Sequence, residues 1–224
     1  MAALDIPEQY LDGVALIGGL NDEAFNELAS ALETAQLAFR HRLFALNVAS
    51  EVKSISQDDI SQIVEMLISM NIVRRSASVE LSEFINDVYE AVVDIGDEAF
   101  DSIVEQEDQF KTKLSKLLSS KSLEIVSKAQ SVVLDHERRF CSVRIASSIS
   151  PVFGSDAEQP PLAAVITHTL RISYHQESND IKEFFVELSE RDLKKLSHSI
   201  KRAGQKAKAL KAILDNGKMP NLEW

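Results

Sequence analysis

Residues 162–174 have the sequence LAAVITHTLRISY, and this stretch decides the fold because its apolar and polar side chains alternate. A period of two places successive side chains on opposite faces of a β-strand. The more apolar face would consist of Leu162, Ala164, Ile166, His168, Leu170, Ile172 and Tyr174. The more polar face would consist of Ala163, Val165, Thr167, Thr169, Arg171 and Ser173. This division predicts an antiparallel sheet that is covered on one side.

Two neighbouring stretches supply the other strands of this sheet. Residues 140–149 also alternate, which predicts a half-buried strand. Residues 150–161 are rich in Pro and Gly and predict a loop. After a turn over residues 176–180, residues 181–188 predict a third strand, with Phe184, Val186 and Leu188 on one face.

A long helix follows the third strand. Ser189 is a good N-cap, and Asp192 stands at the capping-box position, where Glu is more usual. From there to about residue 214, apolar residues recur at spacings of three and four, which is a heptad stripe. The stripe consists of Leu193, Leu196, Ile200, Ala203, Ala207, Leu210 and Leu214. The simplest surface for it to cover is the apolar face of the sheet, so Leu193, Leu196 and Ile200 are interface candidates.

The first 137 residues show helical periodicity alone. The whole chain has 7 Gly and 5 Pro, which is few for 224 residues and favours long helices. Gly18 and Gly19 are expected to end the first helix, and Ser78 to cap the helix around Phe84. We therefore predict an α+β protein. An all-helical N-terminal domain, residues 1–137, precedes a three-stranded antiparallel sheet with one long C-terminal helix, residues 138–224.

Charge is divided unevenly along the chain. The net charge is −11, but residues 1–110 carry 22 Asp and Glu against 5 Lys and Arg, a net of −17. Residues 111–224 carry 13 against 19, a net of +6. Such asymmetry predicts two surfaces with different partners, or two parts that attract each other. The overall acidity disfavours general nucleic-acid binding.

The chain shows no sign of export or membrane insertion. Its N-terminus lacks the basic and then apolar pattern of a signal peptide, and no apolar run approaches the ~20 residues that span a bilayer. The single cysteine, Cys141, cannot form an internal disulfide. We expect a cytoplasmic protein without membrane contact.

No motif for catalysis or cofactor binding stands out. The glycines are scattered, and neither a nucleophile elbow nor a zinc-binding helix is present. A metal site joining Cys141, His136 and His168 is conceivable, but this spacing matches no known ligand pattern. We favour a packed, hydrogen-bonded His168 and a buried Cys141. Carboxylate pairs such as Asp58 and Asp59 fit helix starts better than catalysis. We expect neither enzymatic activity nor a cofactor.

The C-terminal helix carries the strongest electrostatic signal. Between residues 193 and 214 it has no acid, and its basic side chains are Lys194, Lys195, Lys201, Arg202, Lys206, Lys208 and Lys211. A solvated face opposite the heptad stripe is the interpretation we favour, followed by a surface for an acidic protein partner. Nucleic acid is a weaker interpretation, because Lys outnumbers Arg and no aromatic residue interleaves.

Phe185 and Val165 would lie on the otherwise polar face of the sheet. Apolar side chains on such a face predict that either N-terminal helices or a second chain covers them. We therefore add these two residues to the interface candidates.

The C-terminal 75 residues resemble the COMM domain in the order of three antiparallel strands and one long helix. The matching stretches are residues 141–145, 162–174 and 184–188, followed by Leu193, Leu196, Ile200 and Leu210. The resemblance implies an assembly module without catalytic residues, which pairs with a second copy or a related paralogue. The chain is also similar to uncharacterised bacterial proteins of this size, which imply no function.

Three hypotheses follow for the function. The first is a protein-interaction or scaffold module that self-associates through its C-terminal part, with an association insensitive to salt. The second is a nucleic-acid-associated regulator that uses the basic helix, with binding that weakens as salt rises. The third is an enzyme whose pocket collects titratable groups with shifted pKa values.

Overall fold

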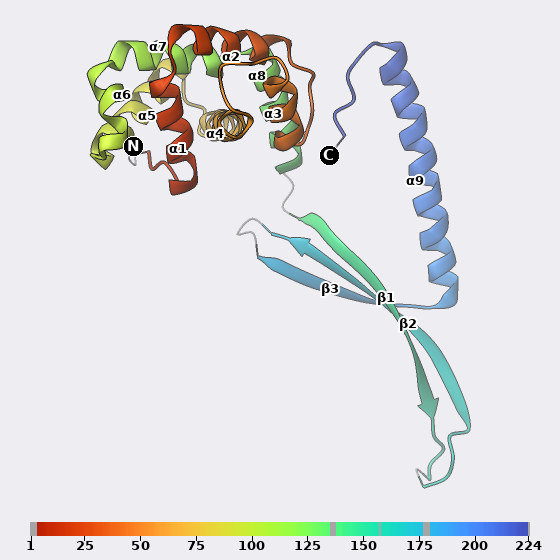
Figure 1. The fold of residues 1–224 in the computed structure, drawn as a ribbon. Helices are drawn as coiled ribbons and strands as arrows, with labels where there is room; N and C mark the ends of the chain where they lie inside the picture. The colour runs from red at the N-terminus through yellow and green to blue at the C-terminus, as the bar shows by residue number, and fades with distance from the viewer. Residues whose placement is uncertain (1–3, 135–137, 157, 177–179, 224) are drawn as a thin grey trace. The chain divides into compact units, whose positions relative to one another are not determined.

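The computed structural model describes residues 4–134, 138–156, 158–176 and 180–223. It confirms the α+β class, because helices precede a three-stranded antiparallel sheet and a long C-terminal helix (Figure 1). The chain divides into two compact units, Met1–Val133 with Leu222–Trp224, and Leu134–Asn221, called here the helical unit and the strand unit. The boundary predicted after residue 137 adjoins residues 135–137, which lie outside the described part of the chain.

The helical unit is built around one central helix. Its elements are α1 (Glu8–Gly19), α2 (Asp22–Thr34), α3 (His41–Ala49), α4 (Gln57–Ser76), α5 (Leu81–Ile95), the 3₁₀ turn η1 (Glu98–Phe100), α6 (Asp101–Glu105), α7 (Glu107–Leu118) and α8 (Lys121–Leu134). Helix α4 packs against both α1 and α3. Its buried residues are Ile60, Ile63, Val64, Met66, Leu67, Ile68, Met70 and Asn71. A helix that is apolar on most sides belongs in the centre of a core.

One predicted helix boundary in this unit is confirmed and another is wrong. Gly18 and Gly19 are the last two residues of α1, which ends at Gly19. Gly18 is also needed where α1 meets α6, because a Cβ at this position would come within 2.9 Å of Ile103 Cδ1. Ser78 does not cap α5, whose N-cap is Glu80. Ser78 has a φ of 55° and belongs to the end of α4.

The start of α4 agrees with the helix-start position predicted for Asp58 and Asp59. Ser56 caps α4, and its side chain accepts a hydrogen bond from the Asp59 N–H at 3.1 Å. Asp58 and Asp59 lie in the first turn of that helix, where acids stabilise the helix dipole. Among the described helices, none combines the length and the apolar character that crossing a bilayer requires.

The strand unit begins with the sheet that the sequence predicts. Its strands β1 (Arg139–Val152), β2 (Ala163–His175) and β3 (Ile181–Leu188) pair in the order β1-β2-β3, and both pairings are antiparallel. The register aligns Ile145 with Leu170 and Leu170 with Val186. An irregularity of the β1 register between Phe140 and Ser142 falls at Cys141.

Helix α9 (Glu190–Asn216) completes the strand unit but does not cover the sheet. The predicted packing of its stripe on the apolar face is therefore wrong. Leu193 and Leu196 are half-buried near the start of α9, whereas Ile200 and Leu210 are exposed. Cys141 is also exposed, which corrects its prediction as a buried side chain. With the helix away from the sheet, both apolar surfaces face solvent.

Candidate interaction surfaces

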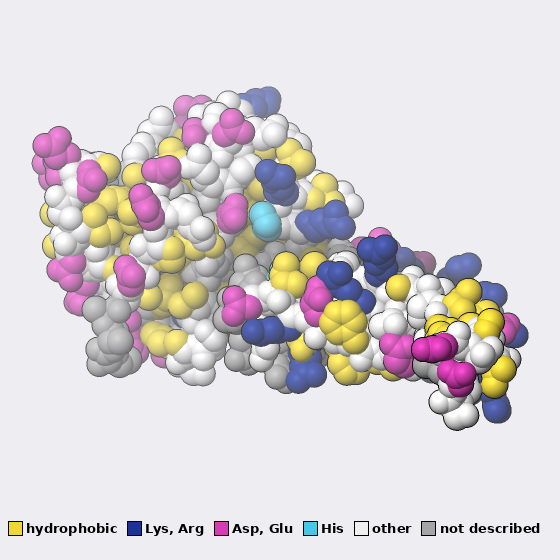
Figure 2. Space-filling view, turned by 90° about the horizontal axis from the view of Figure 1, so that it is seen from below, with side chains coloured by type: hydrophobic (Ala, Val, Ile, Leu, Met, Phe, Trp, Pro, Cys, Tyr) yellow, Lys and Arg dark blue, Asp and Glu magenta, His cyan; other side chains and the backbone are white. Residues whose placement is uncertain are grey.

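The first candidate surface is the apolar face of the sheet, named here the sheet face. Cross-strand partners on it form rows, with Val143, Ile172 and Phe184 in one row and Ile145, Leu170 and Val186 in the next. Its outer residues are widely exposed, from 45% for Ile145 to 69% for Ile149. The exposed hydrophobic residues of the sheet face are Phe140, Val143, Ile145, Ile149, Ile166 and Phe184. Hydrophobic side chains reach the molecular surface beside charged ones (Figure 2).

The opposite face of the sheet is polar. Ser148 and Thr167 hydroxyls lie 3.0 Å apart, the Thr169 hydroxyl donates to Glu187 at 2.6 Å, and Arg171 pairs with Glu183. Cross-strand pairs of this kind stabilise a face that water can reach.

The two predicted interface residues of the strands both lie on this polar face. Phe185 is aligned with Arg171 and Val165 with Ser150. They are not neighbours, since β3 ends opposite His168, before it reaches Val165. The structure therefore places the interface candidates Val165 and Phe185 apart, each among polar side chains.

The second candidate surface is the stripe of α9. Leu193 and Leu196 are half-buried, and further along Ile200 and Leu210 are 63% and 61% exposed. No residue of α9 is buried. A heptad stripe on a helix normally packs against another apolar surface. The stripe from Leu193 to Leu214 is about six turns long, and its middle part from Ile200 to Leu210 is an uncovered apolar surface.

The third candidate surface is the basic side of α9. Lys194 pairs with Glu190 at 2.9 Å and Lys195 with Asp192 at 3.2 Å, both within the first turns of the helix. In the described part of the chain, no ion pair occupies Lys201, Arg202, Lys206 or Lys208. These four cations form the α9 patch. Lys211 lies five turns after Leu193, on the edge of the stripe rather than in the patch.

The sequence predicts the members of the sheet face but not its exposure. The alternation of residues 140–149 and 162–174 places these side chains on one face, which the helix is expected to cover. The structure leaves Ile145 and Phe184 exposed on that face instead. The segment after Ile200 is rich in Ala and Lys and offers few large side chains for packing. This composition is the signal that could have indicated that the helix does not cover the sheet.

Of the three residues in the conceivable metal site, the structure describes Cys141 and His168. His168 Nδ1 lies 2.7 Å from the Ser147 hydroxyl, so the predicted hydrogen-bonded role of this histidine is confirmed. His136 lies outside the described residues. Within the residues that were searched, no three His, Cys, Asp or Glu side chains come together to hold a metal ion.

Hydrogen bonds at the surface account for the lowered carboxyl pKa values. The Ser189 hydroxyl donates to Asp192 at 2.6 Å, and the Ser189 N–H and Lys195 add further bonds, which lowers the pKa of Asp192 to about 2. The Ser54 hydroxyl and the N–H groups of Lys53 and Ser54 lower the pKa of Glu27 in the same way. Asp192 is part of the cap at the start of α9, and Glu27 holds the loop that contains Lys53 and Ser54. Both roles are structural.

One more titratable cluster joins α5 to α7. The ammonium group of Lys111 lies 2.6 Å from a Glu107 carboxylate oxygen and 4.5 Å from the centre of the Tyr89 ring. Burial, reinforced by the Glu107 charge, raises the pKa of Tyr89, while Lys111 lowers the pKa of Glu107. The cluster joins the two helices, and its Lys111 also lines a hollow of about 630 Å³ between α5 and α7.

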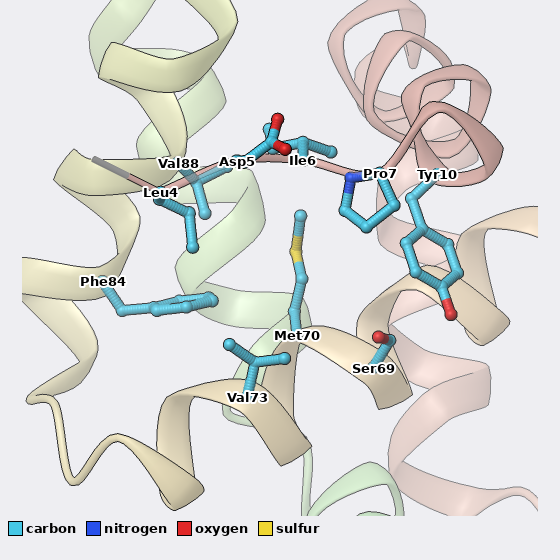
Figure 3. Close-up of a pocket in the computed structure, with 10 residues that line it drawn as sticks. All are labelled: Leu4, Asp5, Ile6, Pro7, Tyr10, Ser69, Met70, Val73, Phe84 and Val88. Carbon is cyan, nitrogen blue, oxygen red and sulfur yellow. The ribbon is translucent and has the colours of Figure 1, made fainter. Parts of the chain in front are cut away.

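A small apolar cavity lies among α1, α4 and α5, closed by the segment before α1 (Figure 3). Its volume is about 110 Å³, and Met70 projects into it between Phe84 and Pro7. Ligand pockets usually measure ~300–1,000 Å³. The residues with shifted pKa values lie elsewhere, so this cavity lacks the features that the enzyme hypothesis requires.

The chain matches no protein-family model, and no curated protein matches its sequence. Function must therefore be inferred from the surfaces of the molecule itself.

Proposed function

We propose that the protein is a non-enzymatic interaction or scaffold module that self-associates through its strand unit. The proposal rests on the small number of buried hydrophobic side chains in this unit. Among the described residues of the strand unit, Leu170 is the only buried hydrophobic side chain. The helical unit, by contrast, buries a continuous core that extends from Ile6 to Val126.

A sheet needs a covered face to be stable. Three strands fold independently when a hydrophobic face is buried or a helix packs against them. Full burial of a Val, Leu, Ile or Phe side chain contributes ~1.5–3 kcal/mol. The sheet face leaves six such residues in water, so a partner that covers it would supply the stabilisation that the isolated unit lacks.

A second copy of the chain is the partner that fits the uncovered surfaces of the strand unit best. Each strand unit has two uncovered apolar surfaces, the sheet face and the stripe of α9. Two copies related by a two-fold axis could cover the sheet face of each with the stripe of the other. This arrangement agrees with the pairing that the COMM-domain resemblance implies, and a related paralogue with the same two surfaces would serve equally.

The alternative is a nucleic-acid-associated regulator, and it depends on the α9 patch alone. The patch consists mainly of Lys, and no aromatic side chain lies between its members for base stacking. Self-association explains the exposure of both the sheet face and the stripe of α9, which nucleic-acid binding to the α9 patch would leave unexplained.

Two adjacent phenylalanines provide a matched test. Phe184 is 55% exposed on the sheet face, and Phe185 is 58% exposed on the polar face. We expect the wild-type protein to be a salt-resistant dimer by light scattering. Phe184→Asp should weaken the dimer by about tenfold or more, because a charge would enter an apolar contact, whereas Phe185→Asp should leave it intact.

Circular dichroism of both variants would show whether the helical unit remains folded. A monomeric wild type at micromolar concentration would refute self-association. A dimer that is lost only in Phe185→Asp would move the interface to the polar face, where the sequence placed Phe185 and Val165.

A further inference from the structure

The α9 patch is a cationic surface without a partner in its own unit. Lys201, Arg202, Lys206 and Lys208 are all exposed, and the helix has no acid between Asp192 and Asp215. On a helical wheel the patch lies opposite the apolar stripe. Contacts made by the stripe would therefore leave the patch free, and any partner of the patch must be a separate one.

Helix α5 presents the opposite charge in a regular row. Its solvent side carries four acids spaced four, three and four residues apart, which places them on one side of the helix. This α5 stripe consists of Glu83, Asp87, Glu90 and Asp94. Like charges at such spacings repel one another, and no cation in the described part of the chain forms an ion pair with them.

Three acids of the helical unit are already engaged. Glu27 accepts hydrogen bonds from Lys53 and Ser54, Glu107 pairs with Lys111, and Glu124 pairs with two cations. The four acids of the α5 stripe have no such ion pair among the described residues, so the row is available for an external cation.

The two charged surfaces match in number, with four acids and four cations. At a rise of 1.5 Å per residue, the α5 stripe is about 16 Å long and the α9 patch about 10 Å long, so the patch fits within the length of the stripe. At 3.6 residues per turn, Lys201 and Lys208 share one side of α9 and Arg202 and Lys206 share another, so one pair at a time can face an adjacent helix. The opposite charge of the two surfaces is the complementarity on which the contact depends.

We propose that the α9 patch docks on the α5 stripe of a second copy of the chain. This contact is different from the apolar self-association proposed above, and it uses none of the same side chains. It is heterologous, since a different surface of each copy takes part, so it joins copies into assemblies larger than a two-fold dimer. Because the contact is electrostatic, added salt should dissociate it.

Two charge-reversed proteins test the proposal. In the first, the patch is reversed by Lys201→Glu, Arg202→Glu, Lys206→Glu and Lys208→Glu. In the second, the stripe is reversed by Glu83→Lys, Asp87→Lys, Glu90→Lys and Asp94→Lys. Mass would be measured by light scattering in about 50 mM and about 500 mM NaCl.

We expect the mean mass of the wild type to rise by about twofold or more at low salt. Each reversed protein alone should remain at its high-salt mass. An equal mixture of the two should regain the larger mass at low salt, because the acidic α9 of one protein meets the basic α5 of the other. Only a contact between copies gives this recovery.

A control protein separates the stripe from net charge. It carries Asp12→Lys, Glu23→Lys, Asp101→Lys and Glu105→Lys, four exposed acids outside the stripe, and it should associate as the wild type does. A wild-type mass that does not depend on salt, a mixture that does not recover, or a control that behaves like the stripe variant would each overturn the proposal. The high-salt mass reports the apolar dimer separately, so either proposal can fail without the other.

Discussion

Ser78 has a left-handed backbone, with a φ of 55°, at the end of α4. Its N–H donates to the Arg75 carbonyl at 3.0 Å, and the Val79 N–H donates to the Arg74 carbonyl at 3.1 Å. These two bonds form a Schellman motif, whose left-handed position is usually Gly. A side chain there is strained because its Cβ approaches the carbonyl oxygen.

Ser78→Gly should therefore stabilise the helical unit by about 0.5–1 kcal/mol, as relief of the left-handed strain outweighs the added freedom of the unfolded chain. Ala77→Gly is the matched control, because Ala77 has a φ of −81° and needs no such freedom. We expect this control to leave stability unchanged or lower. Urea denaturation followed by circular dichroism would measure the free energy of unfolding of both variants. A Ser78→Gly variant that is less stable than the wild type would contradict the strain argument.

At the scale of elements, the contact between α1 and α6 depends on the absence of one side chain. A Cβ on Gly18 would overlap Ile103, which is fully buried, so a shift of Ile103 would disturb the core around it. Gly19, the next residue of the same helix, has no atom within 4 Å of its Cβ position. The two glycines thus differ in packing although they are adjacent in sequence.

Gly18→Ala should destabilise the protein by about 1–3 kcal/mol, because the added methyl group overpacks the contact. Gly19→Ala should be neutral or stabilising by up to about 1 kcal/mol, because Ala favours helix more than Gly does. Thermal denaturation of the two variants provides the comparison. Equal effects on the melting temperature would show that α1 and α6 do not approach closely.

At the scale of the whole molecule, the two units differ in how they are stabilised. The helical unit has its own core, whereas the described residues of the strand unit bury one hydrophobic side chain, Leu170. The proposed self-association would bury more of this unit. A folded state that exists only in a complex becomes more stable as protein concentration rises.

Urea unfolding should therefore show two transitions. The midpoint of the strand-unit transition should rise between about 1 μM and about 50 μM protein, while that of the helical unit should stay constant. Circular dichroism and a fluorophore on Cys141, the single cysteine, which is exposed on β1, serve as separate probes. One concentration-independent transition for both signals would argue that the strand unit is stable without a partner.

The sequence determined the local structure with little help from long-range contacts. The alternation in residues 162–174 predicted β2, and the capping box of Ser189 and Asp192 predicted the start of α9. Such signals are short-range, because the period of side chains and the satisfaction of terminal N–H groups depend on residues a few positions apart.

Only the tertiary structure decided which surfaces meet. The pattern of α9 showed that it has an apolar stripe, but not that the stripe stays off the sheet, and the alternation in β1 could not show that Cys141 is exposed at an irregularity. The role of Gly18 was equally hidden, since Ile103 lies 85 residues further along the chain. Periodicity reports which side chains share a face, whereas the surface that covers that face is chosen by contacts between distant segments or between separate chains.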